Sequence, residues 1–195
     1  MLIFYVSVLT AVIYASLFEW TLHRFVMHRP FLGYWYPYVA HALTHHRIFQ
    51  SDKRYHLQDE KDKHTIHMAW WNGPVLVLLS CIPFDLAGWY LGTWIIPLTA
   101  MGTIACYYGT YEYIHWCMHL PRKRNIERTG VFFRLNGHHV LHHRYPDKNL
   151  NVVLPFADLC FGTLLLRSKI PFNQVRGEMI PDLQPGEAQK TVAHS

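Results

Sequence analysis

The chain has 195 residues, a formal net charge of +5 and a mean hydropathy of +0.01, which allow one domain and do not by themselves exclude a membrane protein. The eighteen basic residues are segregated into two blocks, 24–63 and 122–190, and the stretches 1–22 and 64–121 contain neither Lys nor Arg. This segregation is typical of a membrane protein whose basic blocks face one side. Anionic lipid headgroups then account for the positive charge, and no nucleic-acid partner is expected.

The first predicted element is a membrane-spanning helix over residues 1–20. A helix that crosses a bilayer needs about 20 apolar residues, and this stretch has one charged side chain, Glu19. A signal peptide would begin with basic residues and end in a small-x-small cleavage site. Neither feature is present, and the stretch runs directly into a histidine cluster, so we expect a retained span.

Residues 69–117 are long enough for two further spans. A hairpin that turns near 91–93 fits best, with Trp89, Tyr90 and Trp94 at the membrane interface. A soluble protein with buried core helices is the alternative, which the absence of Lys and Arg disfavours. We therefore expect an all-α, integral membrane helical bundle over residues 1–170, followed by a tail at 171–195. With three spans, both basic blocks lie on one side, which the positive-inside bias makes cytoplasmic.

Fifteen histidines are present, and most of them form four spaced clusters on that same side. Neutral imidazole is the commonest protein ligand of transition metals. One ion takes about three to five such ligands, so the clusters predict a two-metal centre at the cytoplasmic face. The clusters are HRFVMH from His23 to His28, HALTHH from His41 to His46, HWCMH from His115 to His119, and HHVLHH from His138 to His143.

Helical geometry predicts how these histidines are shared. Positions i and i+4 lie on one face of an α-helix, whereas i and i+5 diverge by about 140°. We therefore expect His115 and His119 to act together, and likewise His41 and His45, with His46 pointing further round the helix.

The same reasoning applies to the first and fourth clusters. It assigns His23 and His28 to different ions, unless the helix unwinds near Arg29-Pro30. The fourth cluster contains two offset pairs, with which one helix can feed two ions: His138 with His142, and His139 with His143.

Two carboxylates lie close to the clusters in the sequence. Glu19 is four residues before His23, and Glu112 is three before His115. A carboxylate behind a metal-bound imidazole fixes its tautomer and raises its basicity, and we expect this role for both; the alternative is an interfacial carboxylate. Two histidines outside the clusters, His64 and His67, remain open as further ligands.

These motifs resemble the fatty acid hydroxylase superfamily of integral-membrane di-iron enzymes, which includes acyl-lipid hydroxylases, sterol desaturases and β-carotene hydroxylases. The resemblance covers residues 19–166 and depends on the boxes EWTLHRFVMH, HALTHH, YEYIHWCMH and NGHHVLHHRYPDKNLNV. The trailing PFADLCFGTLL is similar to the family's closing Asp-x-x-Phe-Gly-Thr element, with one extra residue after Asp158. Segment 47–67 matches nothing in that pattern.

The resemblance implies two iron ions, O2 as co-substrate and a non-haem oxidation of an unactivated C–H bond, by hydroxylation or desaturation. The substrate would be a membrane lipid, most simply a fatty-acyl lipid, and the electrons would come from a separate cytochrome or ferredoxin docked near Arg122–Arg128. The implied iron ligands are His23, His28, His41, His45, His46, His115, His119, His139, His142 and His143, with His138 as an additional candidate because the closing box has four histidines where three are usual.

Two other functions remain as alternatives. A carotenoid ring hydroxylase suits the small size, although the third box is shorter than expected for that subgroup. A zinc-binding membrane protein or metal transporter is the non-enzymatic alternative. A transporter would place its ligands at mid-membrane within broken helices, whereas these boxes lie at helix ends.

Overall fold

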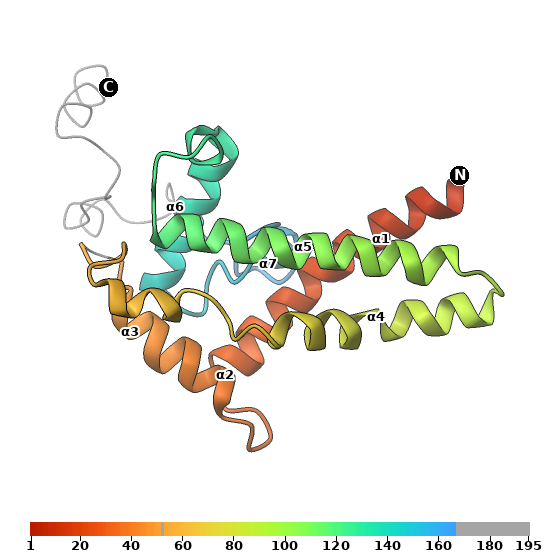
Figure 1. The fold of residues 1–195 in the computed structure, drawn as a ribbon, viewed down its shortest axis with the longest axis horizontal. Coiled ribbons are helices and arrows are strands. Elements are labelled where there is room, and N and C mark those ends of the chain that lie inside the picture. The colour runs from red at the N-terminus through yellow and green to blue at the C-terminus, as the bar shows by residue number, and fades with distance from the viewer. Residues whose placement is uncertain (52, 167–195) are drawn as a thin grey trace.

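The computed structural model describes residues 1–51 and 53–166, and every regular element in this part of the chain is a helix (Figure 1). The all-α prediction is therefore confirmed, and the predicted tail at 171–195 lies outside the described residues. Four long helices form the frame: α1 (Leu2–Leu22), α4 (Asn72–Tyr90), α5 (Ile95–His119) and α6 (Gly130–Arg144). The short elements are the π-helices η1 (His23–Met27) and η2 (Val39–His45), the 3-10 helices η3 (Glu60–Thr65) and η4 (Ile126–Arg128), and α2 (Tyr36–Tyr38), α3 (His46–Ile48) and α7 (Phe156–Cys160).

Helices α4 and α5 form the expected hairpin, and α1 packs against α5 (Figure 1). The turn between α4 and α5 lies at Leu91–Trp94, where Gly92 adopts a positive φ of 63° that favours glycine. Next to the turn, Gly88 allows the two helices to approach closely, because a Cβ there would lie 2.6 Å from Cδ of Pro97.

Among the described residues, two helical stretches are long and apolar enough to cross a membrane, Leu2–Met27 and Asn72–Tyr90. The third expected span, α5, has 25 residues but does not meet this test. Its second half, YYGTYEYIHWCMH, is rich in polar side chains and ends among the histidines. The structure thus supports two of the three predicted spans by length and composition.

Helices α1, α4 and α5 meet in a cluster of small and aromatic side chains. Small residues at helix contacts allow the backbones to approach closely, and here Ala11 of α1 and Ala100 of α5 are fully buried between the helices. The cluster is completed by Cys81, Phe84 and Ile104.

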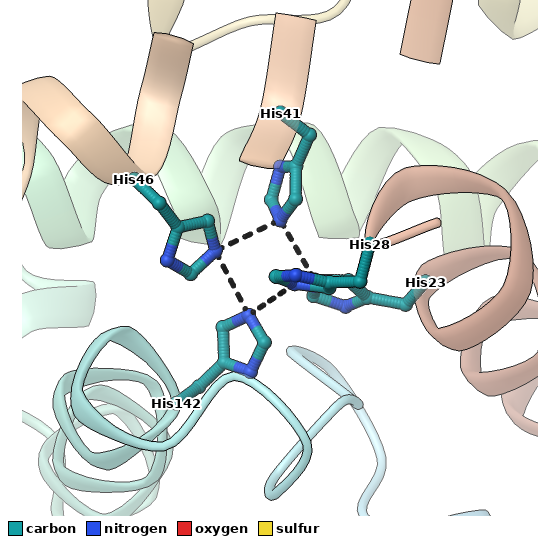
Figure 2. Close-up of side chains that lie close together, drawn as sticks. All are labelled: His23, His28, His41, His46 and His142. Carbon is teal, nitrogen blue, oxygen red and sulfur yellow. Dashed lines mark hydrogen bonds between the residues drawn. The ribbon is translucent and has the colours of Figure 1, made fainter. Parts of the chain in front are cut away.

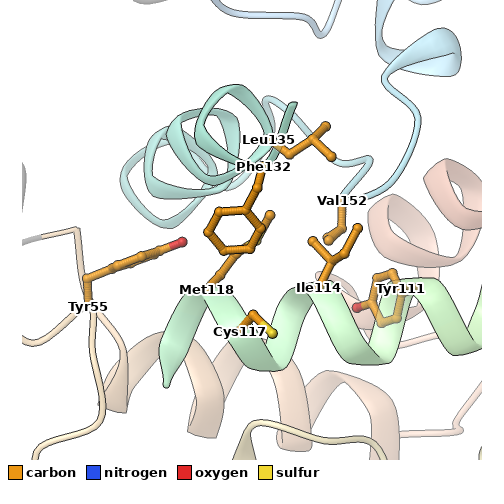
Figure 3. Close-up of a cluster of buried hydrophobic side chains, with 8 residues drawn as sticks. All are labelled: Tyr55, Tyr111, Ile114, Cys117, Met118, Phe132, Leu135 and Val152. Carbon is orange, nitrogen blue, oxygen red and sulfur yellow. The ribbon is translucent and has the colours of Figure 1, made fainter. Parts of the chain in front are cut away.

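A second cluster lies at the far end of α5 and binds α6 to it (Figure 3). Met118 of α5 and Phe132 of α6 pack together there, with Tyr55 closing one side and Val152 the other. The segment that follows α6 in turn packs on α1, where Trp20 contacts Leu150 and Ala157. The four histidine boxes are thereby brought to one end of the bundle.

Candidate metal centre

The histidine side chains converge in two adjacent groups at this end of the bundle. In each group the candidate ligand atoms, one ring nitrogen from each histidine, all lie within 4.8 Å of one another. The first group contains His23, His28, His41, His46 and His142 (Figure 2), and the second contains His45, His119, His139 and His143.

The first box contributes two ligands to one group because it is wound as a π-helix. The backbone N–H of His28 donates to the carbonyl of His23, five residues earlier, at 3.1 Å. A π turn places i and i+5 on one face, and the rings of His23 and His28 stack with centroids 5.0 Å apart. The expectation that these two rings diverge is wrong, because it assumed an α-helix.

The second box is also π-helical, which changes the expected pairing. The backbone N–H of His46 donates to the carbonyl of His41, and the Nε2 atoms of these two histidines are 3.1 Å apart in the first group. His45 points into the second group instead, so the predicted pair of His41 and His45 is corrected. Their ring centroids are nevertheless 5.2 Å apart, which makes the two groups neighbours.

Helix α6 feeds both groups, as its offset histidines predicted. His139 and His143 enter the second group with their Nε2 atoms 3.1 Å apart, and Nε2 of His142 lies 3.1 Å from that of His46 in the first. His138 is half-buried and lies outside both groups. The predicted pair of His138 and His142 is therefore not formed, and the fourth box supplies three candidate ligands.

Helix α5 provides His119 to the second group, with Nε2 3.1 Å from Nε2 of His139. One turn earlier, the ring of His115 lies 4.8 Å from those of His119 and His139 and 4.9 Å from that of His45. Nε2 of His115 and of His45 are buried and have no hydrogen-bond partner among the described residues. His115 therefore lies against the second group with an unused nitrogen.

Backbone carbonyls fix the tautomer of five of these rings. A carbonyl only accepts, so the Nδ1 atom that bonds to it carries the hydrogen, and Nε2 is left with a lone pair. In the first group, His23 donates to Leu150 at 2.5 Å and His142 to Lys148 at 2.8 Å. In the second, His143 donates to Phe49 at 2.6 Å, His119 to Tyr55 at 2.8 Å and His45 to Thr65 at 3.1 Å.

These tautomers fit a cation in each group. Nε2 of His119 and of His143 are both acceptors, yet both face the same Nε2 atom of His139, which carries at most one hydrogen. Facing lone pairs repel unless a positive ion lies between them. At a metal–nitrogen distance of about 2.0–2.1 Å, adjacent ligands of an octahedral ion lie about 3 Å apart. The Nε2 contacts of 2.8–3.2 Å in the first group and 3.1 Å in the second agree with this spacing.

The rings are also neutral, as metal ligands must be. Burial, with smaller contributions from neighbouring histidines, lowers the pKa of His28 to about 3. Burial likewise lowers the pKa of His45 and of His142 to about 4. At neutral pH these lone pairs are therefore available to bind a metal.

The two predicted carboxylates have other partners than those expected. Glu112 accepts hydrogen bonds from Nδ1 of His67 at 2.9 Å and from the hydroxyl of Tyr108 at 2.8 Å, so it orients His67 rather than His115. Glu19 accepts from the backbone N–H of Val152 at 2.6 Å and from the hydroxyl of Tyr107 at 2.6 Å. Any effect of Glu19 on His23 is therefore indirect, through the backbone near Val152.

Two segments outside the four histidine boxes prove important to the centre. Segment 49–65, which matched no pattern, supplies the carbonyls that orient the second group. The carbonyls that orient rings of the first group belong to Lys148 and Leu150. A backbone carbonyl leaves no trace in the sequence, although the polar residues Asn149, Asn151 and Asp158 among apolar neighbours were a visible signal.

Two cavities meet beside the histidines. An apolar slot lies between α1, α4 and α5 and extends from His23 to Ser80 and Ile104. A larger chamber of about 380 Å³ is lined by more polar residues, among them His41, His45, His64, His67 and His115. Met27, Met68 and Tyr111 line both cavities, so the slot and the chamber adjoin at the histidine groups.

No family model, curated protein or solved structure matches this chain. A function for the centre therefore has to be inferred from its own geometry and from the box motifs.

Proposed function

We propose that the chain is a membrane-bound, non-haem di-iron oxidase that uses O2 to hydroxylate or desaturate an unactivated C–H bond of a fatty-acyl lipid. The observation that carries this proposal is the pair of adjacent all-histidine groups beside an apolar slot whose wall includes His23. Metal binding and oxidation of an apolar chain would then take place in one continuous site.

The donor set favours redox-active metals over a structural zinc site. Imidazole ligands suit iron, copper, nickel and zinc alike, but structural zinc is almost always held by four ligands and has no redox chemistry. The first group alone offers five histidines. The resemblance of the four boxes to di-iron hydroxylases selects iron among the remaining metals. When bound, two ferrous ions would supply two electrons that activate O2, and O2 would be the oxidant for removal of the hydrogen atom.

The protein's own residues would bind, orient and exclude water. The histidine rings hold the ions in two fixed groups, and the backbone carbonyls keep the Nε2 lone pairs aimed at them. The slot would hold a hydrocarbon chain with one end near His23, because its wall is almost entirely apolar. The chamber, with Thr44, His64 and Asn72 in its wall, would accept the polar end of the lipid.

The surface of the helical hairpin supports a membrane location. Leu78, Leu86 and Leu98 are 60–64% exposed, and Trp89, Tyr90 and Trp94 at the hairpin turn are more than 80% exposed. Such an apolar surface with aromatic residues at its end matches a lipid contact with an interfacial belt. A multi-pass protein with its histidines at the cytoplasmic face agrees with the segregation of the basic residues.

Electrons would reach the centre from a separate protein. Arg122, Lys123 and Arg128 are exposed in the segment that links α5 to α6. A basic surface of this kind favours an acidic partner, such as a small cytochrome or ferredoxin.

The test combines metal content with product formation. Protein purified anaerobically in detergent and supplied with Fe(II) should bind two irons per chain. Cells that express it under isotopically labelled O2 should accumulate a labelled lipid alcohol or a new alkene, and His119→Ala should abolish this product. A single tightly held zinc without iron uptake, together with unchanged lipid and carotenoid profiles, would refute the proposal. A labelled carotenoid would select the ring-hydroxylase alternative.

A further inference from the structure

We propose that residues 148–165 form a strap that positions the first histidine group through its backbone, with Asp158 as the positioning residue. This inference depends on the metal-binding part of the proposed function and not on the reaction. It is distinct from direct ligation, because the strap contacts the ligands and leaves their Nε2 atoms free.

The strap reaches the first group at two points. The carbonyl of Leu150 accepts from Nδ1 of His23, and that of Lys148 accepts from Nδ1 of His142. The carbonyls that accept from Nδ1 of His45, His119 and His143 in the second group come instead from segment 49–65. Each group therefore has its own supporting segment, and the two supports can be disturbed separately.

Asp158 fixes the direction of the Leu150 carbonyl. This carboxylate is fully buried, and one of its oxygens accepts from the backbone N–H of Asn151 at 2.8 Å. A peptide unit is planar and trans, so the N–H of Asn151 and the C=O of Leu150 point in opposite directions in one plane. Holding that N–H on Asp158 therefore aims the carbonyl of Leu150 away from Asp158, toward His23. The other oxygen accepts from the N–H of Leu150 at 2.9 Å, which fixes the preceding peptide unit as well.

The Lys148 carbonyl is fixed by the same logic through Thr163. The N–H of Asn149, which shares a peptide plane with the carbonyl of Lys148, donates to the carbonyl of Thr163 at 3.1 Å. Thr163 is held in turn by Asp158, since its hydroxyl donates to the carboxylate at 2.6 Å and its N–H donates to the Asp158 carbonyl at 2.9 Å. Both orienting carbonyls thus depend on one buried carboxylate.

The strap is also anchored to the helix that carries His23. The indole N–H of Trp20 donates to the hydroxyl of Thr163 at 2.8 Å, and the side-chain amide of Asn151 donates to the carbonyl of Ser16 at 2.8 Å. Ser16 and Trp20 lie on one face of α1, and His23, the first residue of η1, follows on the same face. The carbonyl of Leu150 and the ring that it orients therefore share one rigid frame.

The test is Asp158→Asn in the full chain, titrated with Co(II) alone in detergent without O2 or lipid. Both carboxylate oxygens accept from N–H groups, so an asparagine must turn its NH2 toward one of those donors. Disturbing an outer partner of a metal ligand weakens metal affinity about 10- to 100-fold, and we expect this loss for the first group alone. The Co(II) absorption bands assign the two binding steps, because His142→Ala should weaken the first-group step and His119→Ala the second-group step.

Asp85→Asn is the matched control, since it makes the same chemical change on an exposed side chain of α4, which carries no histidine of either group. Thr163→Val keeps the side-chain shape and removes the hydroxyl that donates to Asp158 and accepts from Trp20, while the two backbone bonds to the Asp158 carboxylate remain. It should therefore weaken the same step by a smaller factor, even if Asp158→Asn fails to fold. Equal weakening of both steps, or of neither, in the folded variants would overturn the proposal. A wild-type chain that binds no Co(II) would instead count against the proposed function.

Discussion

Replacing His142 and His138 by alanine in separate variants is the sharpest test of the two-group geometry. Both residues lie on α6 in the same box, but only His142 places Nε2 among the first group. Metal binding stabilises four-ligand zinc peptides by about 10–16 kcal/mol. Spread over the five nitrogens of the first group, this corresponds to roughly 2–3 kcal/mol per ligand, or a Kd weakened about 30- to 200-fold.

The assay is an anaerobic Fe(II) titration against a competing chelator, with metal content measured on the same samples. His142→Ala should lower the affinity of one ion by the factor above and leave the other ion bound. His138→Ala should retain both ions at wild-type affinity. His143→Ala, one residue further on, should weaken the other ion, because its ring lies in the second group.

Two results would refute this reasoning. Equal losses in His138→Ala and His142→Ala would show that α6 is rotated relative to the described arrangement. Loss of the same ion in His142→Ala and His143→Ala would show that the histidines form one site and not two.

Three further outcomes are expected. Ile104 lines the end of the slot far from His23, so Ile104→Trp should shift turnover toward shorter acyl chains while the metal content is unchanged. Product analysis across chain lengths would show no shift if the slot does not hold the acyl chain. Glu112→Gln should retain both ions, because its carboxylate bonds to His67 and Tyr108; a metal analysis that finds one ion lost would contradict this. In the metal-free protein, the pKa of His45 and of His142 is about 4 when folded against an ordinary 6.5. The unfolded chain therefore binds more protons than the folded chain below pH 6.5. The free energy of unfolding should fall by about 2 kcal/mol per ring at pH 5. A thermal-unfolding profile that is flat between pH 7 and 5 would exclude this coupling.

The sequence allowed the large-scale arrangement to be predicted because its signals are simple. Apolar length and the absence of basic residues predicted the long helices and a hairpin turn near 91–93, which the structure contains. The clustering of histidines at helix ends predicted their convergence. These predictions depend on composition over many residues and tolerate local errors.

The division of histidines between the two groups could not be predicted from the spacing, because it depends on local winding. His23 with His28, and His41 with His46, pair at i and i+5 through π turns. The helical-wheel argument assumed α geometry and therefore separated both pairs. A π turn at the site of an unusual i, i+5 histidine pair is a common functional departure from regular helix.

The partners of the carboxylates were unpredictable for a different reason. Glu112 is close to His115 along the helix, but its oxygens bond to Tyr108 and to His67, which is 45 residues away in sequence. Likewise Glu19 bonds to Val152, 133 residues away. Contacts of this range depend on how loops return to the helices, and i, i+4 spacing contains no information about them.

The winding of the second box also explains how two ions can be held at a fixed separation. The adjacent residues His45 and His46 enter different groups, as do the adjacent residues His142 and His143 on α6. The rings of His46 and His143, which belong to opposite groups, stack with centroids 4.3 Å apart. Neighbouring residues in a helix have little freedom to move relative to each other. Each pair therefore connects the two groups through a single peptide unit. The distance between the ions would be set by these two rigid helical turns, while the segments 49–65 and 148–165 orient the rings.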